Sequence, residues 1–155
     1  MFRLLPRDKL WIEVRIEELQ TQIKDLGPEF HEVLNQSSET WHDNAPFDAV
    51  RDKQSLLYAE YSHLKYILLN SEPIKKPAEI SAVLIGHKIS ISKNGKTRSY
   101  FVAGDWAHNV SQDFDGAIVV TAQSPLAKAI LGKTIGEETV FGTVSAIESA
   151  SSRLI

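Results

Sequence analysis

The sequence contains no cysteine among its 155 residues. Disulfide bonds, zinc–thiolate sites and cysteine nucleophiles are therefore excluded, which fits a reducing compartment. Apolar runs are also short, and none approaches the roughly 20 residues that a membrane-spanning helix needs. The first residues mix charged and apolar side chains and lack the apolar core of a signal peptide. These absences together predict a cytoplasmic protein that has no membrane partner.

The chain has little net charge, −3 at pH 7, but its acidic residues are unevenly placed. General binders of the phosphate backbone usually carry a basic face, so this balance argues against that class. No Lys or Arg occurs between Lys24 and Arg51. Such a run is either a solvated helix face or a functional acidic surface. Its acidic members are Asp25, Glu29, Glu32, Glu39, Asp43 and Asp48.

Two stretches in the N-terminal half have the residue spacing of a coiled coil. In both, intervals of four and three residues alternate, as they do along the seam of a helix that packs on a partner helix. The polar segment between them is rich in turn and capping residues, and Pro46 suits the first turn of a returning helix. We therefore predict an antiparallel helical hairpin, here called the finger, with its tip near residues 36–45. The two seams are Ile12, Ile16, Leu19, Ile23, Leu26, Phe30 and Val33, then Phe47, Val50, Gln54, Leu57, Tyr61, Leu64 and Leu68.

Prolines mark two further features of the N-terminal half. Gly27–Pro28 predicts a kink in the first arm, because proline removes a helical hydrogen bond and crowds the preceding turn. Two prolines and a pair of lysines in residues 73–80 predict a linker. The expected domains are therefore the finger at 1–72 and a second domain at 81–155.

The second domain shows the period of two that is typical of β-strands. The turn pair Asn94–Gly95 lies between two such stretches and predicts a β-hairpin. Ser124 can cap a short helix, Pro125 fits its first position and Gly132 can close it. We predict an antiparallel sheet of about four or five strands with one short helix, which makes the whole chain an α+β protein.

Two motifs resemble the Gre-type (GreA/GreB) bacterial transcription elongation factors. The first is DNAPFDAVRDKQ at 43–54, which follows a first helix of suitable length. The second is SPLAKAILGK at 124–133, followed by GEE at 136–138, and it is the more specific of the two. With the two-part layout, the resemblance spans nearly the whole chain.

The resemblance implies a definite mode of action on one partner, bacterial RNA polymerase. Gre factors insert the finger into the secondary channel of the polymerase, and two acidic residues at the tip help to hold a magnesium ion of its active site. The ion activates the water that cuts the 3′ end of a backtracked transcript, which fits the preference of magnesium for oxygen ligands. The implied factor is a monomer, has no cofactor of its own and is not itself an enzyme. Its second domain is FKBP-like and docks on the channel rim.

The family's tip acids fall on Asp43 and on Thr40, where a hydroxyl replaces a carboxylate. Glu39, one residue earlier, is the alternative carboxylate, so the implied acids that assist the polymerase magnesium are Glu39 and Asp43, with Asp43 as the shared ligand. Two mechanisms follow: these acids still position the metal and stimulate cleavage, or the finger occupies the channel, cuts poorly and competes with other Gre factors. The further tip contacts are Thr40, Trp41, Asn44 and Arg51.

The second motif supplies the expected docking residues on the polymerase. Two other classes of function remain open. One is a coiled-coil adaptor that dimerises through an exposed seam, and the other is an FKBP-like prolyl isomerase or chaperone, although a fold does not settle function. The docking residues are Ser124, Pro125, Leu126, Lys128, Leu131 and Gly132.

Overall fold

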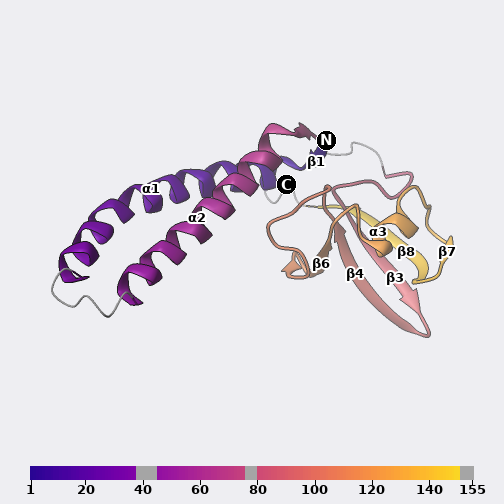
Figure 1. The fold of residues 1–155 in the computed structure, drawn as a ribbon. Helices are drawn as coiled ribbons and strands as arrows, with labels where there is room; N and C mark the ends of the chain where they lie inside the picture. Colours follow the sequence, from indigo (N-terminus) through magenta and orange to yellow (C-terminus); the bar gives the residue numbers. More distant parts are fainter. Residues whose placement is uncertain (38–44, 76–79, 151–155) are drawn as a thin grey trace. The chain divides into compact units, whose positions relative to one another are not determined.

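The structure is a computed structural model, and it describes residues 1–37, 45–75 and 80–150 (Figure 1). The chain divides into two compact units. The finger unit is Ile12–Leu69, and the sheet unit combines Met1–Trp11 with Asn70–Ile155. Within the described ranges, no helix is both long enough and apolar enough to cross a membrane.

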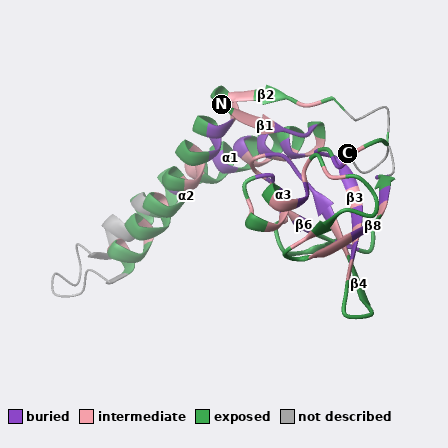
Figure 2. Ribbon diagram, turned by 90° about the vertical axis from the view of Figure 1, so that its right-hand side faces the viewer, coloured by how far each residue is buried: buried purple, intermediate pink, exposed green. Residues whose placement is uncertain are grey.

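The finger unit is formed by two long helices, α1 (Pro6–Ser37) and α2 (Ala45–Leu69), which run alongside each other (Figure 1). The predicted seam positions whose side chains the structure describes are buried or half-buried, whereas the side chains of Phe30 and Val33 lie outside the described set. Ile12, Leu19 and Leu64 are almost fully buried, whereas the positions between seam residues are mostly exposed (Figure 2). A helical hairpin forms because each seam covers the apolar stripe of the other.

Proline has different effects at two places in the finger. Pro46 lies in the first turn of α2, as predicted. Pro28 lies inside α1, which continues through it to Ser37, and the predicted kink stays a prediction. Gly27 and Pro28 are both exposed, so no packed neighbour has to accommodate the proline ring.

The sheet unit contains a six-stranded sheet in the order β5-β6-β4-β3-β8-β7 and one short helix, α3 (Pro125–Ile130). The predicted hairpin is confirmed, and Asn94 and Gly95 have φ values of 53° and 75°, as its tight turn requires. One prediction was too narrow: the sheet is mixed, because β4 and β6 pair in parallel. The strands are β3 (His87–Lys93), β4 (Lys96–Val102), β5 (Asp113–Phe114), β6 (Ala117–Val120), β7 (Glu138–Thr139) and β8 (Gly142–Ser149).

The core of the sheet unit lies along its central strands, which appear buried in Figure 2. Ile89 and Val102 of neighbouring strands are fully buried, and Ala127 and Ile130 of α3 join the same cluster. The short helix therefore closes the core with Ala127 and Ile130, and its half-buried Leu126 packs against the same cluster.

The N-terminus also belongs to the sheet unit. Strand β1 (Phe2–Leu4) pairs in parallel with β2 (Ser71–Pro73), and the side chains of Leu4 and Leu5 are buried. This arrangement differs from the predicted boundaries, which assigned residues 1–72 to the finger and 73–80 to a linker. The difference arises because the apolar side chains at the N-terminus pack in the sheet unit.

Candidate functional site

The predicted tip of the finger lies mostly outside the described residues. Glu39, Thr40, Trp41, Asp43 and Asn44 all fall in the gap between α1 and α2, so their predicted roles stay predictions. Within the described ranges, no group of three or more His, Asp or Glu side chains could hold a metal ion.

The flanks of the tip carry fewer free carboxylates than the sequence suggested. Arg51, the described tip residue, is exposed and lies 3.5 Å from the carboxylate of Asp48. The ammonium of Lys53 on α2 reaches across to Glu29 on α1 at 3.2 Å. Asp48 and Glu29 therefore both have a basic neighbour: Arg51 lies three residues along α2 from Asp48, and the hairpin brings Lys53 of α2 beside Glu29 of α1.

The second motif forms α3 and the turn after it. The hydroxyl of Ser124 accepts a hydrogen bond from the amide of Ala127 at 3.1 Å, and Pro125 occupies the first turn, as predicted. The helix ends at Ile130, and Gly132 has a φ of 80°, a conformation that suits glycine. Local capping chemistry thus accounts for the shape of the motif.

The predicted docking residues divide into two groups by exposure. Pro125, Lys128 and Gly132 are exposed, so their atoms are available to a partner. Leu126 and Leu131 are half-buried and pack against the core, which fixes the helix on the sheet unit.

An apolar groove of about 420 Å³ adjoins the C-terminal end of this motif. The amide of Gly132 donates to the carbonyl of Val83 at 2.9 Å, and the amide of Val83 donates to the carbonyl of Lys133 at 2.9 Å. This pair of bonds ties the motif to the segment before β3. The groove is lined by Arg3, Ile74, Lys75, Val83, Leu84, Ile85, Leu131 and Gly132.

A polar cluster at the start of α1 was not foreseen from the sequence. The guanidinium of Arg3 donates to both carboxylate oxygens of Asp105 at 2.8 and 2.9 Å. Burial raises the pKa of Asp105, but hydrogen bonds from Arg3 and Gln123 outweigh burial and lower this pKa to about 2. Asp105 is therefore a charged anchor for β1.

Next to this anchor, the first turn of α1 holds one buried and one half-buried charged residue. Asp8 is fully buried, and one of its carboxylate oxygens lies 2.8 Å from Nδ1 of His108. The guanidinium of Arg7 lies 4.2 Å from the centre of the Phe114 ring. Burial lowers the pKa of Arg7. Trp11 stacks on the ring of His108. No local pattern could reveal these contacts, because they join residues about 100 positions apart.

Comparison with known proteins connects this architecture to one family. Residues 77–149 match the family described as "Transcription elongation factor, GreA/GreB, C-term". The chain is 33% identical over 128 residues to transcription elongation factor GreA of Metamycoplasma arthritidis, which covers 79% of this chain and 76% of that protein. It is 30% identical over 135 residues to GreA of Macrococcus caseolyticus, covering 84% and 79%.

Among solved structures, the chain is similar to GreA factor homolog 1 of Thermus thermophilus, with 17% sequence identity and a TM-score of 0.44. The match covers 95% of this chain and 98% of that chain. The match to the Metamycoplasma protein is longer than the part of the chain after residue 76, so it takes in residues of the hairpin as well as the sheet unit. The chain therefore belongs to the GreA/GreB family of transcription elongation factors.

Proposed function

We propose that this elongation factor binds bacterial RNA polymerase through the secondary channel, with the finger in the channel and the sheet unit on its rim. The observation that carries the proposal is the match to GreA over three quarters of both chains, which includes the hairpin. The factor supplies no active site of its own in this proposal, and it acts on the transcript cleavage that the polymerase performs.

The docking surface in this proposal is the exposed side of α3 with the adjoining apolar groove. Pro125 and Lys128 are exposed on α3. Leu131 and Gly132 line the groove, together with mostly apolar residues. An apolar centre with charged residues at its edge is the usual composition of a specific protein interface. The surface therefore suits a protein partner better than a phosphate backbone.

The proposed tip chemistry uses Glu39 and Asp43 to help hold a magnesium ion in the polymerase active site. Carboxylate oxygens are suitable ligands for this hard cation, and the ion lowers the barrier to attack by water on the 3′ end of nascent RNA. Thr40 cannot supply the charge of a carboxylate. This residue favours the second candidate function, a Gre-like regulator that occupies the channel and competes with cleavage factors.

The adaptor alternative requires an apolar seam that remains open to a second chain. In the finger unit, the seam residues Leu19 and Leu64 are 0% and 3% exposed, and both are covered within one chain. This burial supports a factor that works as a monomer.

The tip variants give the sharpest prediction. Asp43→Ala should reduce stimulated transcript cleavage about tenfold or more, because it removes a ligand of the metal. Thr40→Asp should increase cleavage, because it restores a carboxylate. To measure this, stalled and backtracked polymerase complexes are incubated with each protein and magnesium. The amount of shortened RNA is then followed over time.

Glu17→Ala is the matched control, since Glu17 is an exposed acid in the half of α1 that is farther from the predicted tip. All variants should bind core polymerase equally in a pull-down. Recovery of no polymerase at micromolar protein would reject the proposed function. Absence of cleavage, together with inhibition of a second Gre factor, would select the competitor mechanism instead.

A further inference from the structure

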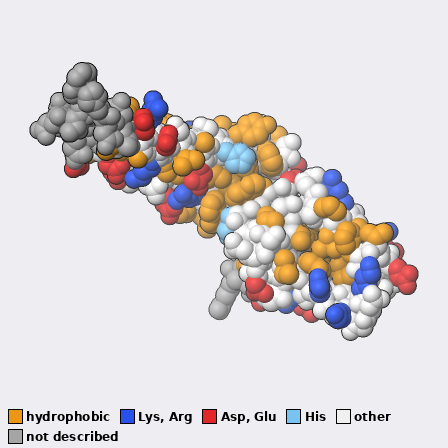
Figure 3. Space-filling view, turned by 60° about the horizontal axis from the view of Figure 1, so that its bottom comes forward, with side chains coloured by type: hydrophobic (Ala, Val, Ile, Leu, Met, Phe, Trp, Pro, Cys, Tyr) orange, Lys and Arg blue, Asp and Glu red, His pale blue; other side chains and the backbone are white. Residues whose placement is uncertain are grey.

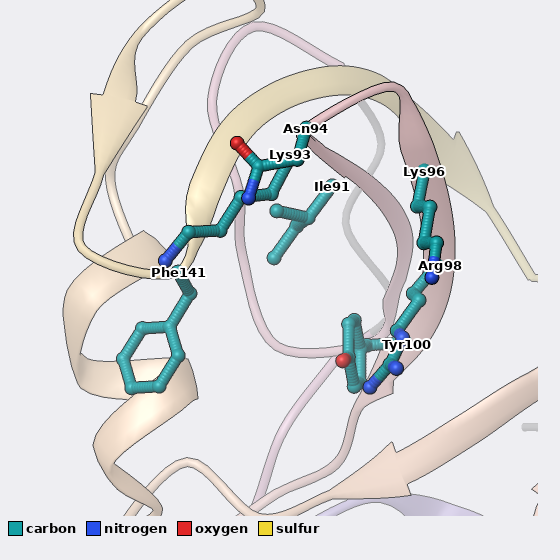
Figure 4. A pocket seen from close by; sticks show the side chains of 7 residues that line it. All are labelled: Ile91, Lys93, Asn94, Lys96, Arg98, Tyr100 and Phe141. Atoms are coloured by element: carbon teal, nitrogen blue, oxygen red, sulfur yellow. The ribbon is translucent and has the colours of Figure 1, made fainter.

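A second pocket, of about 390 Å³, lies on the sheet unit beside the β3–β4 hairpin (Figure 4). Ile91 lies in its middle, and Tyr100 and Phe141 lie on opposite sides of Ile91 (Figure 4). The remaining lining residues are Lys93, Asn94, Lys96 and Arg98. None of the lining residues belongs to the predicted docking motif.

The charges of this pocket have one sign. Lys93 and Lys96 are paired directly across the hairpin, an arrangement that destabilises a sheet when the charges are alike. Arg98 lies two residues along β4, on the same face as Lys96. No ion pair with a described carboxylate is formed by any of the three, although the ammonium of Lys93 donates to the carbonyl of Val140 at 3.1 Å. An anion would offset this repulsion.

Backbone contacts fix the turn that carries Phe141, the aromatic residue opposite Tyr100. Phe141 is 39% exposed, yet its amide donates to the hydroxyl of Thr139 at 3.2 Å, and that hydroxyl donates to the carbonyl of Gly142 at 2.9 Å. Gly142 has a φ of 132°, and a Cβ there would lie 2.6 Å from the carbonyl oxygen of Ser92. The turn that carries Phe141 is therefore packed against β3, which fixes the backbone from which the ring projects.

The wider surface of the sheet unit has the same mixed character. Figure 3 shows apolar side chains gathered on one face of this unit, with Lys and Arg side chains around them. Planar rings stack on aromatic side chains, and phosphates bind Lys and Arg, so this combination of residues recognises nucleotides.

We infer that the pocket binds a free nucleoside di- or triphosphate. The base lies over Ile91 between Tyr100 and Phe141, and the phosphates contact Lys93, Lys96 and Arg98. A volume of about 390 Å³ suits one small ligand. A single strand of nucleic acid would instead need cations spread along a groove. None of the lining residues is acidic, so the site binds the ligand without metal-assisted chemistry by the pocket itself.

The test is calorimetric titration of the full chain with ATP and GTP, and with adenosine and inorganic triphosphate as the separated parts. We expect saturable binding of at least one nucleoside triphosphate and weaker binding of either part alone. Arg98→Ala and Phe141→Ala should each weaken binding about tenfold, since each removes one recognition element. Phe141→Trp should retain binding, because it keeps a ring for stacking.

Lys24→Ala is the matched control, because it removes one exposed positive charge from the finger unit. It should leave the affinity unchanged, and thermal unfolding should show that every variant is folded. The inference is overturned by absence of binding at millimolar nucleotide, by inorganic triphosphate binding as tightly as the nucleotide, or by an oligoribonucleotide binding more tightly than any mononucleotide. Polymerase is absent from the experiment, so its outcome is independent of the proposed function.

Discussion

Single side chains fasten the N-terminal strand to the rest of the sheet unit. Asp105 accepts hydrogen bonds from the backbone amide and the guanidinium of Arg3, and from the amide of Gln123 at 2.7 Å. The carboxylate side chain is only 8% exposed. A buried charge of this kind stabilises the fold only while its partners are present, because removing one partner leaves the other charge without compensation.

Asp105→Asn tests this anchor. Because folding lowers the pKa of Asp105 from its ordinary value of 3.8 to about 2, its stabilisation is complete above pH 3.8 and is lost as the pH falls towards 2. At pH 7 the variant should lose about 1–2 kcal/mol of unfolding free energy relative to the natural chain. Denaturant titrations at pH 7 and pH 2 measure the difference.

The two proteins should differ far less at pH 2, because protonation removes the same charge from the natural chain. Asp52→Asn, at an exposed position of α2, should have little effect at either pH. An equal loss for Asp105→Asn at both pH values would show that the charge is not responsible.

Residues whose roles depend on sequence neighbours were predictable, and residues with distant partners were not. The cap at Ser124 and the turn at Asn94–Gly95 follow from side-chain chemistry within a few positions, and the structure confirms both. Arg3 and Asp105 are separated by 102 positions, so only folding brings them together. The tip acids Glu39 and Asp43 lie outside the described residues and stay predictions.

At the scale of elements, the finger is stabilised by two matched seams and by charges along their edges. Leu19 is buried within the hairpin, and the guanidinium of Arg15 on α1 makes two hydrogen bonds with the carboxylate of Glu60 on α2, at 2.7 and 3.0 Å. Such edge pairs favour one register of the helices. Most of the stabilisation comes from the buried seam, since exposed ion pairs contribute little.

Leu19→Ala should destabilise the finger unit by about 2–5 kcal/mol, because it leaves a cavity in the seam. The loss of stability is measured by NMR, from the hydrogen-exchange rates of the amides in α1 and α2. Leu56→Ala is the control, because Leu56 is 73% exposed and its truncation should change stability by about 0.5 kcal/mol or less. Equal effects of the two substitutions would contradict the seam.

The spacing of apolar residues predicted the hairpin, but the strand pattern did not predict the topology of the sheet. The alternation of side chains reveals that a segment is a strand and leaves its partner undefined. Residues 103–116, which include β5, connect β4 to β6 and return the chain so that these strands run parallel. Periodicity alone could not distinguish this connection from a simple antiparallel turn.

At the scale of the whole molecule, the two ends of the sequence contribute to one unit. Gly104 makes this possible, because a Cβ at this position would collide with the carbonyl oxygen of Arg3. The amide of Asp105 donates to that same carbonyl at 2.8 Å. The N-terminal strand and the segment after β4 thus approach at a distance that only glycine allows.

Gly104→Ala should displace β1 and lower the unfolding free energy of the sheet unit by about 1–3 kcal/mol, as overpacking does. The amides of β1 and β2 should lose protection from hydrogen exchange. Gly27→Ala is the matched control: a Cβ there meets nothing within 4 Å. That substitution should stabilise α1 by about 1 kcal/mol. Unchanged protection of β1 in the Gly104 variant would refute the close approach.

The position of β1 also determines the order in which the chain can fold during synthesis. Phe2–Leu4 precede the finger in the sequence, but their partner strand Ser71–Pro73 follows only after the whole finger. The finger, Ile12–Leu69, is therefore the first unit able to close. The sheet unit must wait until β8, at Gly142–Ser149, has left the ribosome and paired with β3. Because such non-local pairings form slowly, closure of the sheet unit limits the rate at which the whole chain reaches its native state.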